Sequence, residues 1–230
     1  MKKYLLTIGI VSLTLLSFGQ YRASAGIAVG ENATMFTVGA EREFNIISDK
    51  IHINPGVRGN FYIGENLDFI TAPVKYTAND EYVDTLYSVW NSSFNFINLY
   101  VRLRYDITEK LAISFDIDID LVGLTFGSVE STLLLGEGES SRNDNVTATP
   151  VTGASPTTIN YLIMGDLDNG SLNSTLGLTY NLTKKFAIDA GFGLVFTEVT
   201  SDIAVGYDGN DRFRNKNMLG YLGVSYGFGK

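Results

Sequence analysis

Tyr105-Asp-Ile-Thr-Glu-Lys-Leu-Ala-Ile113 returns, with few changes, as Tyr180-Asn-Leu-Thr-Lys-Lys-Phe-Ala-Ile188. Each copy contains the end of an apolar strand, a short polar turn with Thr and Lys, and the start of another apolar strand. Thr favours turns because its hydroxyl group can hydrogen-bond to the nearby backbone. A shorter echo is Ile47-Ser-Asp-Lys-Ile-His-Ile53. The three segments predict three hairpins with related tight turns.

Apolar and polar residues alternate on both sides of these turns, which is the period of a β-strand. Apolar residues and one Tyr occupy the odd positions of 97–107 and 111–121, whereas many even positions carry charged groups. In 186–196, mostly large apolar residues alternate with Ala, Asp, Gly and Val, and 218–228 combines the same residue classes. Segments of this kind form sheets with two chemically different faces.

The alternation predicts eight strands, at 20–30, 33–46, 51–64, 94–107, 111–127, 171–182, 186–203 and 216–228. Each has about ten residues or more, the length that a tilted strand needs to cross a bilayer. Tight connections follow the second, fourth and sixth strands, and long ones follow the third, fifth and seventh. We therefore expect an all-β fold: an eight-stranded antiparallel transmembrane β-barrel with short periplasmic turns and long outer loops.

The N-terminal segment has the features of a secretory signal peptide. Two lysines precede an apolar run from Leu5 to Phe18, which is short for a membrane-spanning helix. We expect residues 1–19 to be the signal peptide, with cleavage after Ala25 as the alternative. Residues 20–230 then form the outer-membrane β-barrel domain, with the first strand intact.

Composition narrows the possible partners. The chain has no cysteine, which excludes a disulfide framework and thiol chemistry. Its net charge of −8 argues against nucleic acid as a partner. An exported protein without cysteine fits a location in the cell envelope.

An exported soluble β-sandwich would show the same alternation, so other features must distinguish the two folds. Aromatic residues near the expected strand ends favour an interfacial girdle; they are Phe94, Phe96, Tyr105, Tyr180, Phe186, Tyr226 and Phe228. Small residues on the opposite strand faces suit a narrow lumen; they are Gly177, Gly191, Gly193, Gly223 and Gly227.

With this signal segment, turn repeat, alternation and aromatic last strand, the chain resembles small outer-membrane β-barrel proteins of Gram-negative bacteria. It is similar to the OmpX, OmpA and OmpW kind, and especially to the outer-membrane β-barrel domain proteins of Bacteroidetes. The resemblance implies a location in the cell outer membrane, contact with outer-membrane lipid, and assembly by the barrel assembly machinery. It assigns the C-terminal assembly signal to Tyr226 and Phe228, which Gly229-Lys230 follow in this chain.

Register predicts the contents of the lumen. If Ile107 lies opposite Leu111, Arg102 faces Asp116 across the hairpin. We expect a luminal charge network of Glu41, Glu43, Arg58, Arg102, Arg104, Asp116, Asp118, Asp120 and Asp189. Eight strands enclose little more than their own side chains, and buried charges must be paired. A filled lumen is therefore favoured over a large aqueous pore, with a charged path or a cation site as the alternative.

The sequence offers little for catalysis. Its single histidine, His52, follows a tight turn and is interpreted as a hydrogen-bonding side chain of the lumen. We find no constellation for nucleophilic catalysis, and we predict no catalytic residue, cofactor or metal site. Asp166-Leu-Asp-Asn-Gly170 is interpreted as a turn rather than a calcium loop, because Gly177 stands where a calcium-binding Glu is needed.

Loops 65–93 and 128–170 are the candidates for binding a surface ligand, although packing on the barrel rim is the alternative. The first loop contains Phe69, Tyr76, Tyr82, Tyr87 and Trp90. We expect a monomeric, non-enzymatic protein with a structural or surface-interaction role. The alternatives are binding or porin-like passage of a small solute, and an accessory barrel of a secretion system.

One irregularity concerns the first tight turn. The apolar positions of the preceding strand, ending at Phe44 and Ile46, are out of phase with Ile47. The first turn must therefore be one residue longer than the other two or contain a β-bulge.

Overall fold

The computed structural model describes residues 20–48, 50–72, 85–119, 123–130, 133–137, 149–151, 153–161, 168–202 and 211–228. The expected signal peptide, residues 1–19, lies outside the described residues. No helix in the described part of the chain is long and apolar enough to cross a membrane.

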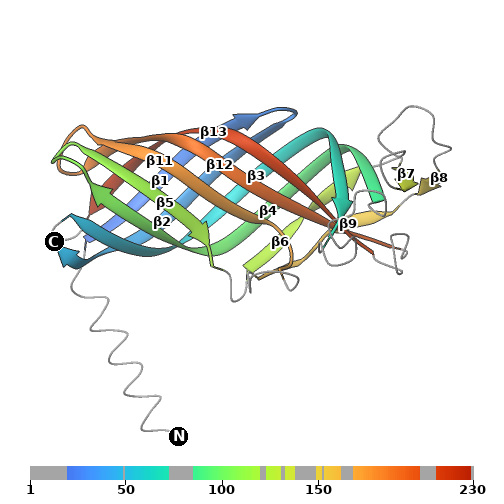
Figure 1. The fold of residues 1–230 in the computed structure, drawn as a ribbon, viewed down its shortest axis with the longest axis horizontal. Coiled ribbons are helices and arrows are strands. Elements are labelled where there is room, and N and C mark those ends of the chain that lie inside the picture. Colours follow the sequence, from blue (N-terminus) through green and yellow to red (C-terminus); the bar gives the residue numbers. More distant parts are fainter. Residues whose placement is uncertain are drawn as a thin grey trace, which may run out of the picture.

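Eight strands form a closed antiparallel ring (Figure 1). In ring order they are β1 (Gln20–Gly30), β2 (Ala33–Ser48), β3 (Ile51–Thr71), β4 (Thr85–Asp106), β5 (Leu111–Asp118), β11 (Leu172–Asn181), β12 (Phe186–Ser201) and β13 (Arg212–Phe228). The ring closes between β1 and β13, which pair from Tyr21–Phe228 to Gly30–Leu219. The predicted eight-stranded antiparallel fold is confirmed.

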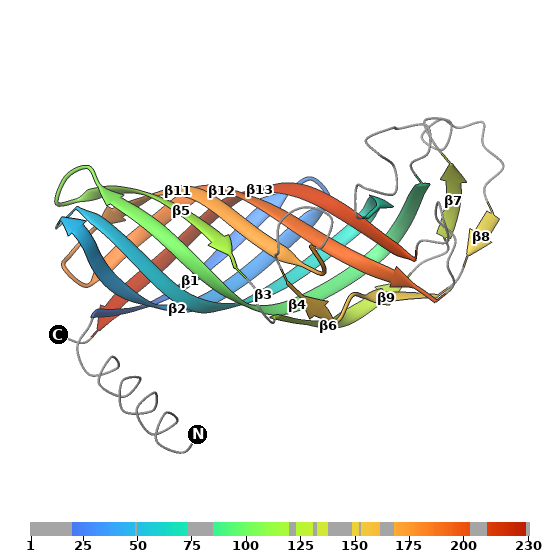
Figure 2. The ribbon, with the colours of Figure 1, turned by 60° about the horizontal axis from the view of Figure 1, so that its bottom comes forward.

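The predicted strand 111–127 is interrupted. β5 ends at Asp118, and β6 (Gly123–Glu130) continues the pairing with β4 from Ile97 to Asn91. The following connection contains four short strands, β7 (Leu133–Glu137), β8 (Thr149–Val151), β9 (Ala154–Pro156) and β10 (Ile159–Asn160). β7, β8 and β9 lie toward the same end of the barrel (Figure 2). We call this end the loop end and the opposite one the turn end.

The two long copies of the repeat form the same turn. The Ile107 N–H donates to the Leu111 carbonyl at 2.9 Å, and the Leu182 N–H donates to the Phe186 carbonyl at 2.9 Å. The first of these is the predicted pairing of Ile107 with Leu111, and the second repeats it in the other copy. The first turn differs, because the β2–β3 register shifts between Asn45 and Ser48. The predicted irregularity therefore lies at the end of β2, just before this turn.

Large apolar side chains point outward on every strand of the ring, for example Ile27 on β1, Phe36 on β2 and Leu222 on β13. Five of the aromatic residues predicted for the girdle are exposed on the outer face near the turn end. They are Tyr105, Tyr180, Phe186, Tyr226 and Phe228. The barrel is thus apolar outside, the reverse of a soluble protein.

The prediction was wrong for Phe94 and Phe96, which point into the barrel and are fully buried. The physical reason is their parity on β4. They share the even positions of inward-facing Asn98 and Arg102, whereas the outward residues such as Ile97 are odd. Their position near a strand end suggested a girdle, but strand alternation decides the face.

The barrel continues beyond the short β1–β2 hairpin at the loop end. There β3 pairs directly with β13, with Thr71 opposite Phe213 and Ile70 opposite Arg214. On the other side, β9 pairs with β12 and β10 pairs with β6. We call this extension beyond the hairpin the wall. It consists of the ends of β3, β12 and β13, together with β6, β9 and β10.

Inside the ring, the Tyr221 side chain covers two glycines, Gly26 of β1 and Gly223 of β13. A Cβ atom at either Gly26 or Gly223 would clash with the ring of Tyr221. Because these positions lack side chains, the tyrosine ring can lie flat against the strands and fill the narrow lumen. Gly223 faces the lumen, as the sequence predicts.

Candidate functional site

The middle of the lumen is organised around Arg58 of β3. Its Nε donates to Asp118 Oδ1 at 2.7 Å, and its Nη1 donates to Asp116 Oδ2 at 2.9 Å. Its remaining Nη2 donates to the carbonyl oxygen of Asn173 on β11. All of these groups are buried. One guanidinium thus links three strands, β3, β5 and β11, through the barrel interior.

Arg102 of β4 forms a second link. It lies directly opposite Asp116 in the β4–β5 ladder, with Nη2 and Oδ2 3.5 Å apart. Its Nη1 lies 3.4 Å from Glu41 Oε1 on β2. Glu41 also accepts hydrogen bonds from the hydroxyl group of Tyr100 at 2.7 Å and the side-chain amide of Asn54 at 3.0 Å.

Asp118 is fully buried and accepts more than the Arg58 bond. The Asn98 amide donates to Asp118 Oδ2 at 2.8 Å, and the backbone N–H of Asn173 donates to the same oxygen at 2.7 Å. The neutral donors satisfy the oxygen that Arg58 does not reach. A carboxylate with these partners can remain charged in an interior from which water is excluded.

A second charged layer lies near the turn end. Arg104 Nε donates to Asp106 Oδ1 at 2.8 Å, whereas Glu43 Oε2 lies 3.7 Å from Arg104 Nη1 and 3.8 Å from Arg22 Nη2. His52 places Nδ1 2.8 Å from Asn45 Oδ1 and Nε2 3.2 Å from Asp106 Oδ2.

An apolar layer lies between the charged lumen and the loop end. It contains Met35, Tyr62, Leu67, Phe69, Val89, Phe94, Phe96, Val195, Val199, Phe213 and Leu219, all of them buried. The Phe94 ring packs against Tyr62 with centroids 6.0 Å apart and against Phe69 at 6.1 Å. Phe69 was predicted to lie in loop 65–93, but β3 extends to Thr71 and carries it into the barrel.

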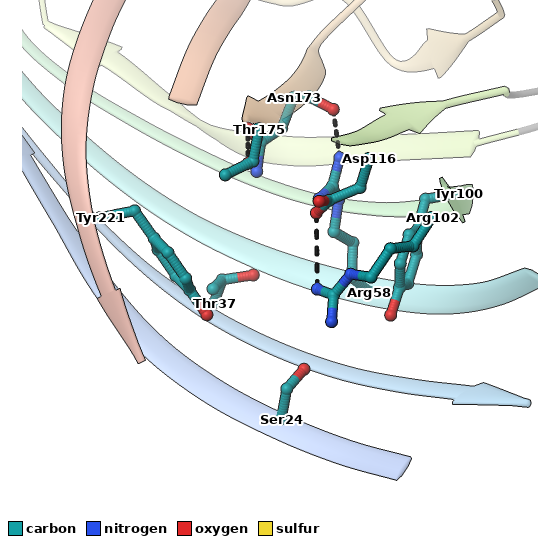
Figure 3. A pocket seen from close by; sticks show the side chains of 9 residues that line it. All are labelled: Ser24, Thr37, Arg58, Tyr100, Arg102, Asp116, Asn173, Thr175 and Tyr221. Carbon is teal, nitrogen blue, oxygen red and sulfur yellow. Dashed lines mark hydrogen bonds and ion pairs between the residues drawn. The ribbon is translucent and has the colours of Figure 1, made fainter. Parts of the chain in front are cut away.

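A small cavity remains in the charged layer (Figure 3). Its volume is about 20 Å³, enough for one water molecule. It is lined by Ser24, Thr37, Arg58, Tyr100, Arg102, Asp116, Asn173, Thr175 and Tyr221. Figure 3 shows these side chains converging from strands on opposite sides of the barrel.

Eight of the nine residues predicted for the charge network line the lumen, and the ninth, Asp120, lies outside the described residues. The structure brings seven of them into the two charged layers. Asp189 lies apart from these ion pairs and accepts a hydrogen bond from Thr179 Oγ1 at 2.5 Å.

Sequence reasoning missed Arg22 and the amide side chains that complete the network, such as Asn98 and Asn173. Arg22 is the one charged residue of β1, so no charge pattern identified it. Asn98 could have been predicted to face the lumen, because it occupies an even position of the same strand as Arg102. Among the described residues, no group of three metal-binding side chains is present.

A further ion cluster lies on the outer side of the wall at the loop end. Glu198 is fully buried, and its carboxylate oxygens accept bonds from Arg212 Nε at 2.9 Å and Arg214 Nη2 at 2.7 Å. It also accepts the Gly170 N–H at 3.2 Å, while both arginines donate to the carbonyl oxygen of Asp168.

The cluster fastens the chain segment that precedes β11 to the wall, so we call it the loop clamp. Burial alone would lower the pKa of Arg212, but the hydrogen bond and charge of Glu198 outweigh burial and raise it. Gly170 has φ +80°, a left-handed conformation that glycine adopts readily. Asp166 of that motif lies outside the described residues.

No protein-family model matches the chain, and no curated protein matches it. Several solved structures have a similar fold. The Yersinia pestis attachment invasion locus protein Ail, in complex with the heparin analogue sucrose octasulfate, is 14% identical over 91% of this chain and 99% of that chain, with a TM-score of 0.38.

The N-terminal β-barrel domain of Pseudomonas aeruginosa OprF is 10% identical over 91% of this chain and 98% of that chain, with a TM-score of 0.41. The outer membrane enzyme PagL is 8% identical over 88% of this chain and 97% of that chain, with a TM-score of 0.36. At these identities the likeness concerns the fold alone.

Proposed function

We propose that this protein is an integral barrel of the cell outer membrane, with a closed lumen and a surface-interaction role at its loop end. The outer face supports the location. Exposed apolar side chains such as Phe192 and Leu222 surround the ring. In water they would form a far larger apolar patch than soluble monomers expose. In a bilayer they contact lipid, and the closed ring satisfies its backbone hydrogen bonds internally.

The observation that carries the proposal is the double closure of the lumen. Arg58 and Arg102 join their carboxylate partners across its middle, and the buried rings of Phe94 and Phe96 fill the space above. The cavity between the charged residues has a volume of only about 20 Å³. Side chains in these two layers leave no room among the described residues for a hydrated solute to pass.

The loop end supports a surface role. β3 and β13 extend the wall, and the loop clamp holds the segment before β11 against it. Much of the predicted loop 65–93 belongs to β3 and β4, so the segment proposed to bind there is the connection between these two strands. This connection and the one within 128–170 start from the wall, so they can bind a surface ligand outside the cell. Rigid scaffolds commonly present binding loops in this way.

The surroundings of His52 support a non-enzymatic role. Its ring nitrogens lie within hydrogen-bond distance of Asn45 and Asp106, neither of which is a hydroxyl nucleophile. Nucleophilic catalysis needs a Ser, Thr or Cys beside the base. In the described part of the chain, no such group is recorded as a hydrogen-bond partner of His52.

At the turn end, we propose that Tyr226 and Phe228 are the residues recognised by the barrel assembly machinery. Both rings are exposed on the outer face of the last strand, and Phe228 stacks on Tyr21 with centroids 5.9 Å apart. Replacing both with Ala should reduce the folded barrel in outer-membrane fractions more than it reduces folding of the purified chain into lipid.

The closed lumen is tested by electrical recording. Purified barrel in planar lipid bilayers should give no stable large conductance, and proteoliposomes should not swell in small sugars or amino acids. Heat-modifiable migration on gels first establishes that the sample is folded. Stable conductance or rapid swelling would overturn the closed lumen and favour solute passage instead. Recovery of the exported protein in soluble fractions would contradict the location.

A further inference from the structure

The turn end contains an open, mainly basic pocket, which we call the vestibule. Its volume is about 480 Å³. Its charged lining residues are Arg22, Glu43, Arg104, Glu109, Lys110 and Lys184. The size is within the range of small-molecule binding pockets, about 300–1,000 Å³.

The charge of the vestibule is opposite to that of the whole protein. Four of its lining side chains are cationic and two are acidic, although the chain carries a net charge of −8. Lys110 and Lys184 come from the two copies of the repeated turn, which lie side by side: the Asn181 N–H donates to the Lys110 carbonyl at 2.8 Å. The fold thus gathers positive charge at one mouth of an acidic molecule.

Arg22, Glu43 and Arg104 form the floor of the vestibule, and Arg22 has a hydrogen-bond donor there that Glu43 does not satisfy. The Arg22 side chain is deeply buried, with the residue only 7% exposed. Its Nη1 donates to Ser225 Oγ at 3.2 Å, but within the described residues its buried Nε has no hydrogen-bond partner. Such a donor is costly to leave unpaired.

Glu43 does not form a close hydrogen bond with either arginine of the floor. Its Oε2 lies 3.8 Å from Arg22 and 3.7 Å from Arg104, too far for hydrogen bonds, and has no hydrogen-bond partner among the described residues. His52 lies 3.4 Å from the other oxygen of Glu43. Arg104 has a closer acid in Asp106, whose Oδ1 lies 2.8 Å from its Nε, but Glu43 is the nearest acid of Arg22 and lies too far for a hydrogen bond. Above this floor, the rim has two cations, Lys110 and Lys184, and one acid, Glu109.

We propose that the vestibule binds a phosphate group. A phosphate has several strong acceptor oxygens and nearly two negative charges at neutral pH, whereas one more carboxylate would neutralise only a single cation. Arg22 and Arg104 supply guanidinium donors from the floor, and Lys110 and Lys184 supply mobile ammonium groups from the rim. A free phosphate compound could supply the group, and so could an inner-leaflet lipid whose headgroup is a phosphate monoester, such as phosphatidic acid.

The test uses the full barrel in nanodiscs of zwitterionic phosphatidylcholine, with inorganic phosphate as the probe. The side-chain Nε–H signal of Arg22 is followed by NMR at constant ionic strength, with chloride as the reference anion. We expect a saturable shift with phosphate and none with chloride. K110Q/K184Q should weaken the apparent affinity at least tenfold. Because both lysines are exposed turn residues, this variant should still fold.

The matched control is Lys216→Gln, which removes an exposed lysine at the opposite end of the barrel and should leave the affinity unchanged. Nanodiscs with phosphatidic acid, whose headgroup is a phosphate monoester, distinguish the source. If the Arg22 signal is already shifted there without added phosphate, the ligand is a lipid headgroup; if it still needs added phosphate, the ligand is free. A shift that does not saturate, that chloride reproduces, or that K110Q/K184Q retains in full would overturn the proposal.

Discussion

The hydroxyl oxygens of Thr108 and Thr183 accept equivalent pairs of backbone hydrogen bonds in two separate turns. Thr108 Oγ1 accepts from the N–H groups of residues two and three positions later at 3.2 and 3.0 Å. Thr183 Oγ1 accepts from the corresponding groups at 3.2 and 2.9 Å. The repeated sequence therefore encodes one turn geometry twice.

Replacing either threonine with Ala should destabilise the barrel to a similar extent. Each change removes an acceptor shared by two N–H groups in an exposed turn, so we expect a loss of about 1 kcal/mol each. Urea unfolding in lipid vesicles measures the free energy. Thr108→Ser and Thr183→Ser keep the oxygen and are the controls. A full-sized loss in the Ser variants would show that the hydroxyl oxygen is not the cause.

Arg58→Met should strongly destabilise the barrel. It removes the cation between Asp116 and Asp118 and leaves two buried carboxylates without their main partner, at a cost of about 3–5 kcal/mol. The same unfolding measurement applies. The triple variant R58M/D116N/D118N removes the uncompensated charges as well and should recover part of the loss. If it were less stable than Arg58→Met alone, the electrostatic explanation would be wrong.

The strands and the facing residues could be predicted because alternation and turn chemistry are local. Once Ile107 lies opposite Leu111, the ladder alone brings Arg102 opposite Asp116. Partners on strands distant in sequence were harder to predict. The hydrogen bonds that Arg58 donates to Asn173 and that Tyr100 donates to Glu41 depend on the tilt and closure of the whole ring.

The apolar layer and the loop clamp could not be predicted for a related reason. Phe94 follows the inward parity of its strand, but aromatic residues near strand ends suit both an interfacial girdle and a barrel interior. Glu198 lies on the outer parity of β12, which suggests exposure. The segment around Gly170 covers it, and this contact between distant parts of the chain has no periodic signal in the sequence.

Glu198→Gln should loosen the loop clamp without unfolding the barrel. It keeps the shape but removes the charge that Arg212 and Arg214 share, so opening of the segment before β11 should become easier by about 3 kcal/mol. Hydrogen exchange of the Gly170 amide and limited proteolysis report this opening. Glu130→Gln changes an exposed acid at the same end and is the control. Unchanged Gly170 exchange would show that the charge is not needed.

Phe94→Ala and Phe192→Ala distinguish the interior of the barrel from its lipid face. Phe94 is fully buried against Tyr62 and Phe69, so its removal leaves a cavity and should cost about 3–5 kcal/mol. Phe192 is 67% exposed on the outside, where lipid chains can fill the space, so its loss should be smaller by about 1 kcal/mol or more. Urea unfolding in the same vesicles compares the two. Equal losses, or a larger one for Phe192, would contradict an interior packed by Phe94.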